Sequence, residues 1–139
     1  MTESQLRRLA TTMRLLEDGL DEIATALMSP RERTMTVVQD DIPKSILPSM
    51  LELIAQLANQ IQKMKFEYGL ASQVFSNRKR FLAKLSSLSI DLTEATSRYM
   101  VGFGEVPEKE RGPLDSRLSA MIALVEELAT MLTAAAQDT

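Results

Sequence analysis

The sequence predicts an all-α protein, an antiparallel helical bundle built from long heptad-patterned helices. Apolar residues recur at alternating spacings of three and four along most of the chain, which is the period of a helix that buries one stripe. Aromatic residues make up only 4% of the sequence, while there are 9 Met. The core must therefore be filled by Leu, Met, Ala and Ile, and all but Ile are strong helix formers. At 139 residues, with 45% hydrophobic and 25% charged residues, we expect a single domain covering residues 1–139.

The first helix is expected over residues 2–28. Thr2 and Gln5 have the spacing of a capping box, in which each side chain satisfies a backbone N–H of the other residue. Ser29 and Pro30 end the helix. An unbroken a/d seam runs between these signals: Leu6, Leu9, Met13, Leu16, Leu20, Ile23 and Leu27.

Residues 29–47 form the first irregular stretch. It contains Pro30 and Pro43, and about 19 residues is long for a connection inside a compact bundle. Five apolar side chains could anchor it, so we expect this loop to pack across the bundle: Val37, Val38, Ile42, Ile46 and Leu47.

A second helix is expected over 48–101, with Pro48 in its first turn and Gly102-Phe103-Gly104 as its stop. Its heptads slip by one residue near 76–77, where a seam ending at Phe75 gives way to one beginning at Phe81. Because neither Gly nor Pro lies at 76–77, a local stutter in one continuous helix is favoured over a turn. A continuous helix of about 80 Å favours an elongated dimer, and a break would give a four-helix up-down bundle.

The last helix is expected over 113–136, opening at Gly112-Pro113. Its seam repeats spacings of four and three: Leu114, Leu118, Met121, Val125, Leu128, Leu132 and Ala135.

The composition excludes several kinds of chemistry. The chain has no Cys, and therefore no disulfide or thiolate, and no His, the usual general base and transition-metal ligand. No phosphate-binding loop, nucleophile motif or calcium-binding loop is present, so we expect no enzyme activity, no cofactor and no metal site. The N-terminus has no signal-peptide pattern, and no run of about 18 consecutive apolar residues occurs. A cytoplasmic protein without membrane insertion is therefore expected.

The seams themselves are the strongest functional feature. They predict a non-enzymatic helical protein–protein interaction module (an adaptor, scaffold or chaperone-like protein) that self-associates as a dimer and forms helix-in-groove contacts with a protein partner. Apolar residues beside the main seams are the candidate partner contacts, expected to be exposed: Phe66, Leu70, Leu82, Ile90 and Met100.

Two alternatives remain open. A basic patch could bind nucleic acid or another anion, although the formal net charge of −3 provides no general attraction to it: Arg78, Lys79, Arg80 and Lys84. A small ligand or substrate could instead occupy a site under the loop 29–47, held by Arg31 and Arg33 through their forked donors.

Overall fold

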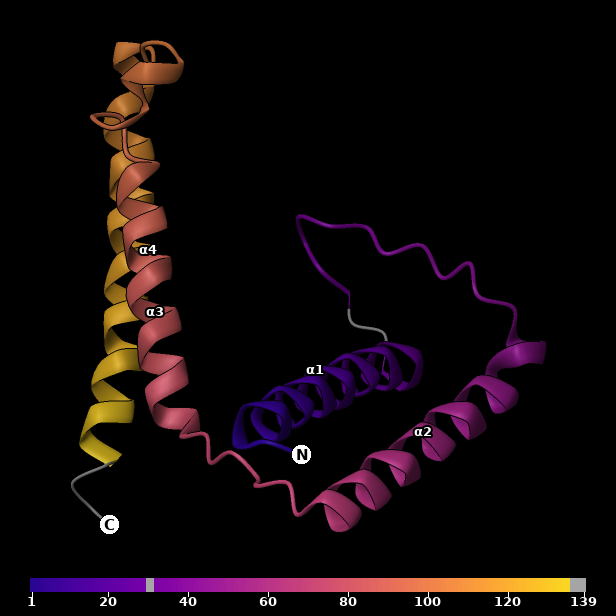
Figure 1. Cartoon of the computed structure of the whole chain (residues 1–139). Coiled ribbons are helices and arrows are strands. Elements are labelled where there is room, and N and C mark those ends of the chain that lie inside the picture. Colours follow the sequence, from indigo (N-terminus) through magenta and orange to yellow (C-terminus); the bar gives the residue numbers. More distant parts are fainter. Residues whose placement is uncertain (30–31, 136–139) are drawn as a thin grey trace. The chain divides into compact units, whose positions relative to one another are not determined.

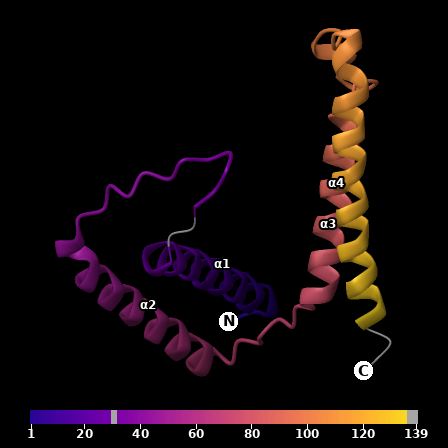
Figure 2. The same cartoon turned by 180° about the vertical axis from the view of Figure 1, so that it is seen from behind.

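The computed structural model describes residues 1–29 and 32–135, and every regular element within these ranges is a helix. The prediction of an all-α fold is confirmed. The chain divides into two compact units, Met1–Gln73 and Val74–Thr139. Each unit is an antiparallel pair of helices, α1 with α2 and α3 with α4, as Figures 1 and 2 show.

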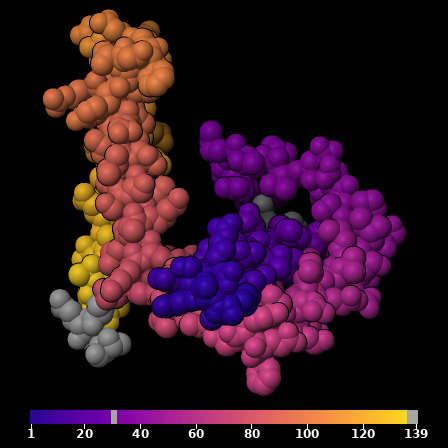
Figure 3. Space-filling view, viewed as in Figure 1, coloured from indigo at the N-terminus to yellow at the C-terminus, as the bar shows by residue number. Residues whose placement is uncertain are grey.

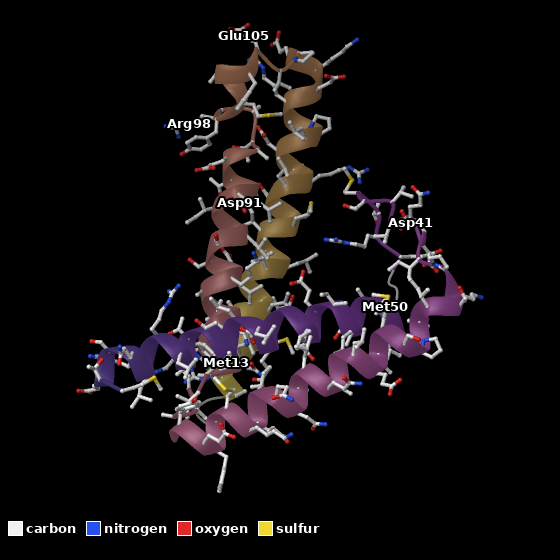
Figure 4. The ribbon with its side chains drawn as sticks, turned by 45° about the vertical axis from the view of Figure 1, so that its right-hand side comes forward. Met13, Asp41, Met50, Asp91, Arg98 and Glu105 are labelled. Atoms are coloured by element: carbon white, nitrogen blue, oxygen red, sulfur yellow. The ribbon has the colours of Figure 1, made fainter. Side chains whose placement is uncertain are left out.

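The first unit consists of α1 (Glu3–Met28), a short 3-10 turn at Lys44–Ile46 and α2 (Leu47–Tyr68). The capping box predicted at the start of α1 is present: the N–H of Thr2 donates to Oε1 of Gln5 at 2.8 Å, and the N–H of Gln5 donates to Oγ1 of Thr2 at 3.1 Å. Pro48 lies in the first turn of α2, as predicted. Figure 4 labels the half-buried Met13 on α1 and Met50 on α2.

The loop between α1 and α2 packs less closely than the sequence suggested. Val37 is 95% exposed, and the trace from residue 32 to residue 43 runs as a wide arc away from the helices in Figure 1. The expectation that all five apolar loop residues act as anchors is therefore wrong, because only Leu47, which already belongs to α2, is half-buried.

The continuous helix predicted over 48–101 is also wrong. α2 ends at Tyr68 because Gly69 adopts the left-handed conformation, with φ of 60°, that glycine reaches without steric cost. The N–H groups of Gly69 and Leu70 both donate to the carbonyl of Lys65, which satisfies an acceptor at the helix end. The break that the slipped heptads allowed therefore exists, but it begins at Gly69, several residues before 76–77.

α3 (Asn77–Glu94) begins where Ser76 caps it by accepting a hydrogen bond from the N–H of Lys79 at 3.2 Å. The helix ends well before the predicted glycine stop, because the hydroxyl of Thr96 bonds the carbonyl of Thr93 and the N–H of Ser97 donates to Asp115 instead of to a helical carbonyl. A 3-10 turn at Met100–Phe103 follows.

α4 (Glu108–Ala135) begins five residues earlier than predicted and contains Pro113 within its second turn. Glu108 and Glu110 in the first turn favour this start, because carboxylates are stabilised at the positive end of the helix dipole. The N–H of Glu110 also bonds the carbonyl of Pro107 at 2.9 Å. Figure 3 shows α3 and α4 packed along their length.

The buried core is very small. Among the described residues only two hydrophobic side chains are buried, Ile61 at 8% exposure and Leu70 at 7%, both in the first unit. The chain exposes 11759 Å² of surface. Two separate compact globules, each with half the mass, would together expose roughly 8,700 Å². Much apolar surface is therefore left uncovered.

Candidate interaction surface

α4 carries two neighbouring rows of apolar side chains. One row is half-buried at spacings of four and three and belongs to the side that contacts α3: Leu114, Leu118, Ile122, Val125, Ala129 and Leu132. The second row is exposed, at spacings of three, four and three, with Leu124 at 61% and Met131 at 63%: Met121, Leu124, Leu128 and Met131. The two rows lie about 100° apart around the helix axis. An angle of that size separates the two neighbours of a helix in a four-helix bundle.

α3 presents a matching edge. Phe81 and Leu88, one heptad apart, are exposed beside a half-buried row that contains Leu85 and Leu92. A groove of about 360 Å³ shows that this edge and the exposed row of α4 are on the same side of the hairpin, since both helices line it: Phe81, Lys84, Leu85, Leu128, Met131 and Leu132. We refer to six exposed side chains as the α3/α4 apolar face: Phe81, Leu88, Met121, Leu124, Leu128 and Met131.

Charged residues border this face along α3. Lys84 and Asp91 lie seven residues apart, at the same heptad position, on the row just outside Phe81 and Leu88. Asp91 is labelled in Figure 4. A lysine and an aspartate at equivalent positions give the border a positive end and a negative end.

A hydrogen-bonded corner fixes the closed end of the hairpin. Asp115 on α4 accepts from the N–H of Ser97 at 2.8 Å and from its hydroxyl at 2.5 Å. The hydroxyl bond, followed by the backbone bond, lowers the pKa of the Asp115 carboxyl below its usual value. Nearby, the guanidinium of Arg98 stacks over the ring of Tyr99, 5.6 Å from its centre. The corner thus holds α3 and α4 in register, which aligns the two halves of the face.

The five apolar residues proposed from sequence as partner contacts do not gather on one surface. Phe66 and Ile90 are exposed, at 90% and 55%, but they belong to different units. The expectation of exposure is wrong for Leu70, which is buried after the Gly69 turn. Leu82 and Met100 are half-buried, Leu82 in the row of α3 that also holds Leu85. Sequence reasoning assigns the residues of the α3/α4 apolar face to ordinary seams or does not single them out, although the double row on α4 is visible in the spacing.

The four residues of the basic patch are spread around α3. Successive residues on a helix differ by about 100°, so Arg78, Lys79 and Arg80 point in three directions. Arg78 is half-buried, and Arg80 lies over the ring of Phe75, 5.7 Å from its centre, with Nη1 3.4 Å from Oδ1 of Asn77. Lys84 borders the apolar groove instead. Arg80 and Lys84 are four residues apart and lie on one side of α3, whereas Arg78 and Lys79 point in other directions.

A hollow of about 490 Å³ lies between the end of α1, the loop and the start of α2. Its described lining is mainly apolar, with Asp40 and Lys44 as its charged members; the apolar members are Ile23, Ala26, Leu27, Val38, Ile42 and Leu47. Arg33 is exposed and is not among these lining residues, and Arg31 lies outside the described residues.

α4 is also, within residues 1–29 and 32–135, the one helix that is long and apolar enough to cross a membrane by length and composition alone; 6% of its apolar window is buried. Core helices pass the same test. Glu126 and Glu127 lie in this part of the helix. A charged side chain near the centre of a bilayer costs roughly 2.5–3.5 kcal/mol on insertion scales, so these carboxylates favour contact with protein or water over lipid.

Comparison with known proteins gave no match: no family model, no curated protein and no solved structure resembles this chain.

Proposed function

We propose that this protein is a non-enzymatic helical interaction module that self-associates and binds protein through the α3/α4 apolar face. The observation that carries the proposal is the second, exposed apolar row on α4 beside the row that contacts α3. A surface helix needs one apolar stripe to pack on one neighbour, whereas a stripe two rows wide provides for two neighbours. Exposed contiguous apolar patches of this kind mark interaction sites.

The chemistry of the face suits a helical partner. It offers leucine, methionine and phenylalanine at heptad spacing, which accept the apolar side of another helix as knobs into holes. Its two methionines, Met121 and Met131, can adapt to an irregular partner surface. The face has no polar group at its centre that would position a substrate.

The test compares two double variants of α4 in which both substituted positions are shifted by one residue. Leu124→Lys/Met131→Lys places two charges within the face, while Ala123→Lys/Thr130→Lys places them on the exposed polar side of the same turns. In both variants the lysines lie three or four residues from Glu126 or Glu127, so local helix stability is similar. Circular dichroism checks that both variants remain helical.

We expect sedimentation analysis to show association of the native chain and of Ala123→Lys/Thr130→Lys, and a loss of at least about 100-fold in affinity for Leu124→Lys/Met131→Lys, because each lysine would be desolvated in an apolar interface. Equal association of the two variants contradicts the proposal.

A ligand-binding protein is a second candidate, favoured by the hollow beneath the loop. Its volume of about 490 Å³ lies in the range of small-molecule pockets, and its mainly apolar lining with Lys44, beside Asp40 as the other charged lining residue, suits a carboxylate with an aliphatic body. Calorimetric titration with decanoate tests this candidate. We expect binding that is weakened by Lys44→Ala and blocked by Ala26→Trp. The absence of heat with the native chain rejects it.

A further inference from the structure

Resting on the proposed function, we propose that the α3/α4 apolar face packs against the same face of a second copy, with α3 antiparallel to the partner's α3 and α4 antiparallel to the partner's α4. The two hairpins then form one four-helix bundle around a two-fold axis perpendicular to the helices. Three observations lead to this arrangement: the positions of the apolar residues on α3 and on α4, the charges that border them, and the apolar surface area that they offer.

On each of the two helices, antiparallel pairing with a second copy is symmetric about one point. In antiparallel coiled helices an a-position residue packs beside a d-position residue of the partner. On α3 this pairs Leu85 with the second copy's Leu88, about a centre between residues 86 and 87. On α4 it pairs Leu124 with Leu128 and Met121 with Met131 across the copies, about a centre at residue 126.

These two centres lie at the same height in the hairpin. Ser97 is level with Asp115, to which it is hydrogen-bonded, and the groove places residues 81–85 beside residues 128–132. A position midway between 86 and 87 on α3 is therefore level with about residue 126 on α4. A single two-fold axis serves both helices, which is the condition for an isologous interface.

The charged border lies close to the same axis. Lys84 and Asp91 are seven residues apart at one heptad position, and their midpoint between residues 87 and 88 is one residue from that of Leu85 and Leu88. Antiparallel pairing of α3 therefore brings Lys84 of each copy within one turn of Asp91 of the other. Two opposite-charge pairs form, and such flanking pairs determine the orientation of paired helices. A parallel pairing would instead set lysine against lysine and aspartate against aspartate.

The available area is sufficient for a stable pair. Six side chains that are about half exposed offer on the order of 600 Å² of apolar surface per copy, so two copies bury about 1,200 Å², the lower limit for specific interfaces. The border residues and the half-buried row add to this area. Contact with a second copy thus buries enough area for a specific interface.

The absence of native cysteine allows a direct test of the register. Lys84→Cys and Asp91→Cys chains are prepared separately, mixed and treated with a short bis-maleimide. We expect the mixture to give a covalent dimer in which Cys at 84 is linked to Cys at 91, while each variant alone gives at least roughly tenfold less because like positions lie about 10 Å apart along the axis.

Exchange of the two charges provides an independent measurement. We expect Lys84→Glu and Asp91→Lys each to weaken the dimer roughly three- to tenfold, and the double variant Lys84→Glu/Asp91→Lys to restore the native affinity, because both cross-copy pairs become attractive again.

The outcomes separate this inference from the proposed function. Association that depends on Leu124 and Met131 but gives no 84–91 link and no charge rescue overturns the antiparallel register and leaves the interaction module in place. A link between Asp91→Cys and Arg117→Cys chains instead would set α3 against the partner's α4, which also overturns the inference. If the chain remains monomeric, a second copy is not the partner of the face. The self-association in the proposed function is then wrong as well.

Discussion

The two helical hairpins follow the same three-and-four spacing of apolar residues but use it differently. The first hairpin buries Ile61 and Leu70, whereas the described part of α3 and α4 buries no hydrophobic residue to the same degree. α4 instead keeps a whole second row exposed. Heptad spacing thus shows that a helix has an apolar stripe, and the width of the stripe shows how many neighbours the helix needs.

The connections differ as well. The loop after α1 is open, with Val37 almost fully exposed, while the segment 95–107 between α3 and α4 is tied to α4 through Asp115 and Ser97. α1/α2 buries two side chains, whereas α3/α4 packs through half-buried rows, is fixed at its closed end by Asp115 and Ser97, and leaves one face exposed. Substitutions in the two hairpins should therefore have different consequences.

The largest expected effect on stability is in the small core of the first hairpin. Ile61→Ala should lower the free energy of unfolding by about 2–3 kcal/mol, since it removes buried surface and leaves a cavity. Phe66→Ala, five residues along α2, should change it by less than about 0.5 kcal/mol, because Phe66 is almost fully exposed. Urea titration measures both values, and equal losses would show that Phe66 is covered in solution.

Two glycines should respond to alanine with opposite signs. Gly69→Ala should destabilise the chain by about 1 kcal/mol, since a Cβ is disfavoured at φ of 60° even with open space around it. Gly19→Ala, in the interior of α1 with no atom within 4 Å of the added Cβ, should stabilise it by up to about 1 kcal/mol. Thermal unfolding compares the two variants, and stabilisation by both would mean that α2 continues past Gly69.

The two N-caps should contribute about as much to the free energy of unfolding as these glycines. Thr2→Ala should cost about 1 kcal/mol because it removes an acceptor for the N–H of Gln5, and Ser76→Ala should cost about as much at α3. Ser76→Asp, which keeps an acceptor, is the control. A Ser76→Ala chain as stable as the native one would argue that α3 does not begin at Asn77.

The smallest effect is expected at the corner of α3/α4 and depends on pH. The pKa of Asp115 is lowered in the folded chain, so its contribution to stability is present above the ordinary carboxyl value of 3.8 and is lost as pH falls through the lower folded value. The gap in melting temperature between the native chain and Asp115→Ala should therefore narrow below about pH 4. A gap that stays constant down to pH 2 would show that the charge of Asp115 makes no contribution.

Much of the fold was predictable because its signals are local. The capping box of Thr2 and Gln5, the first-turn Pro48 and the helical periods all appear in the structure. The break between α2 and α3 was misplaced because Gly69 lies within an intact apolar pattern, and only its left-handed conformation identifies it as a helix end. The early end of α3 was not predictable, because Asp115, which takes the N–H of Ser97, is 18 residues away in sequence.

The residues of the α3/α4 apolar face were likewise only partly predictable from the sequence. The sequence places apolar residues at 121, 124, 128 and 131 on one side of a helix, and that much follows from 3.6 residues per turn. It could not show that Leu70 is buried or that Phe81 lines a groove with Met131, since both depend on which side of a helix its neighbour occupies.

Caps, periodicity and composition act over a few residues, and for that reason the sequence already showed that this protein is helical and where α1 and α2 begin. The tertiary structure alone decided which apolar rows are covered within each hairpin and which remain exposed. Burial depends on contacts between segments far apart in the chain, and local spacing carries no information about them.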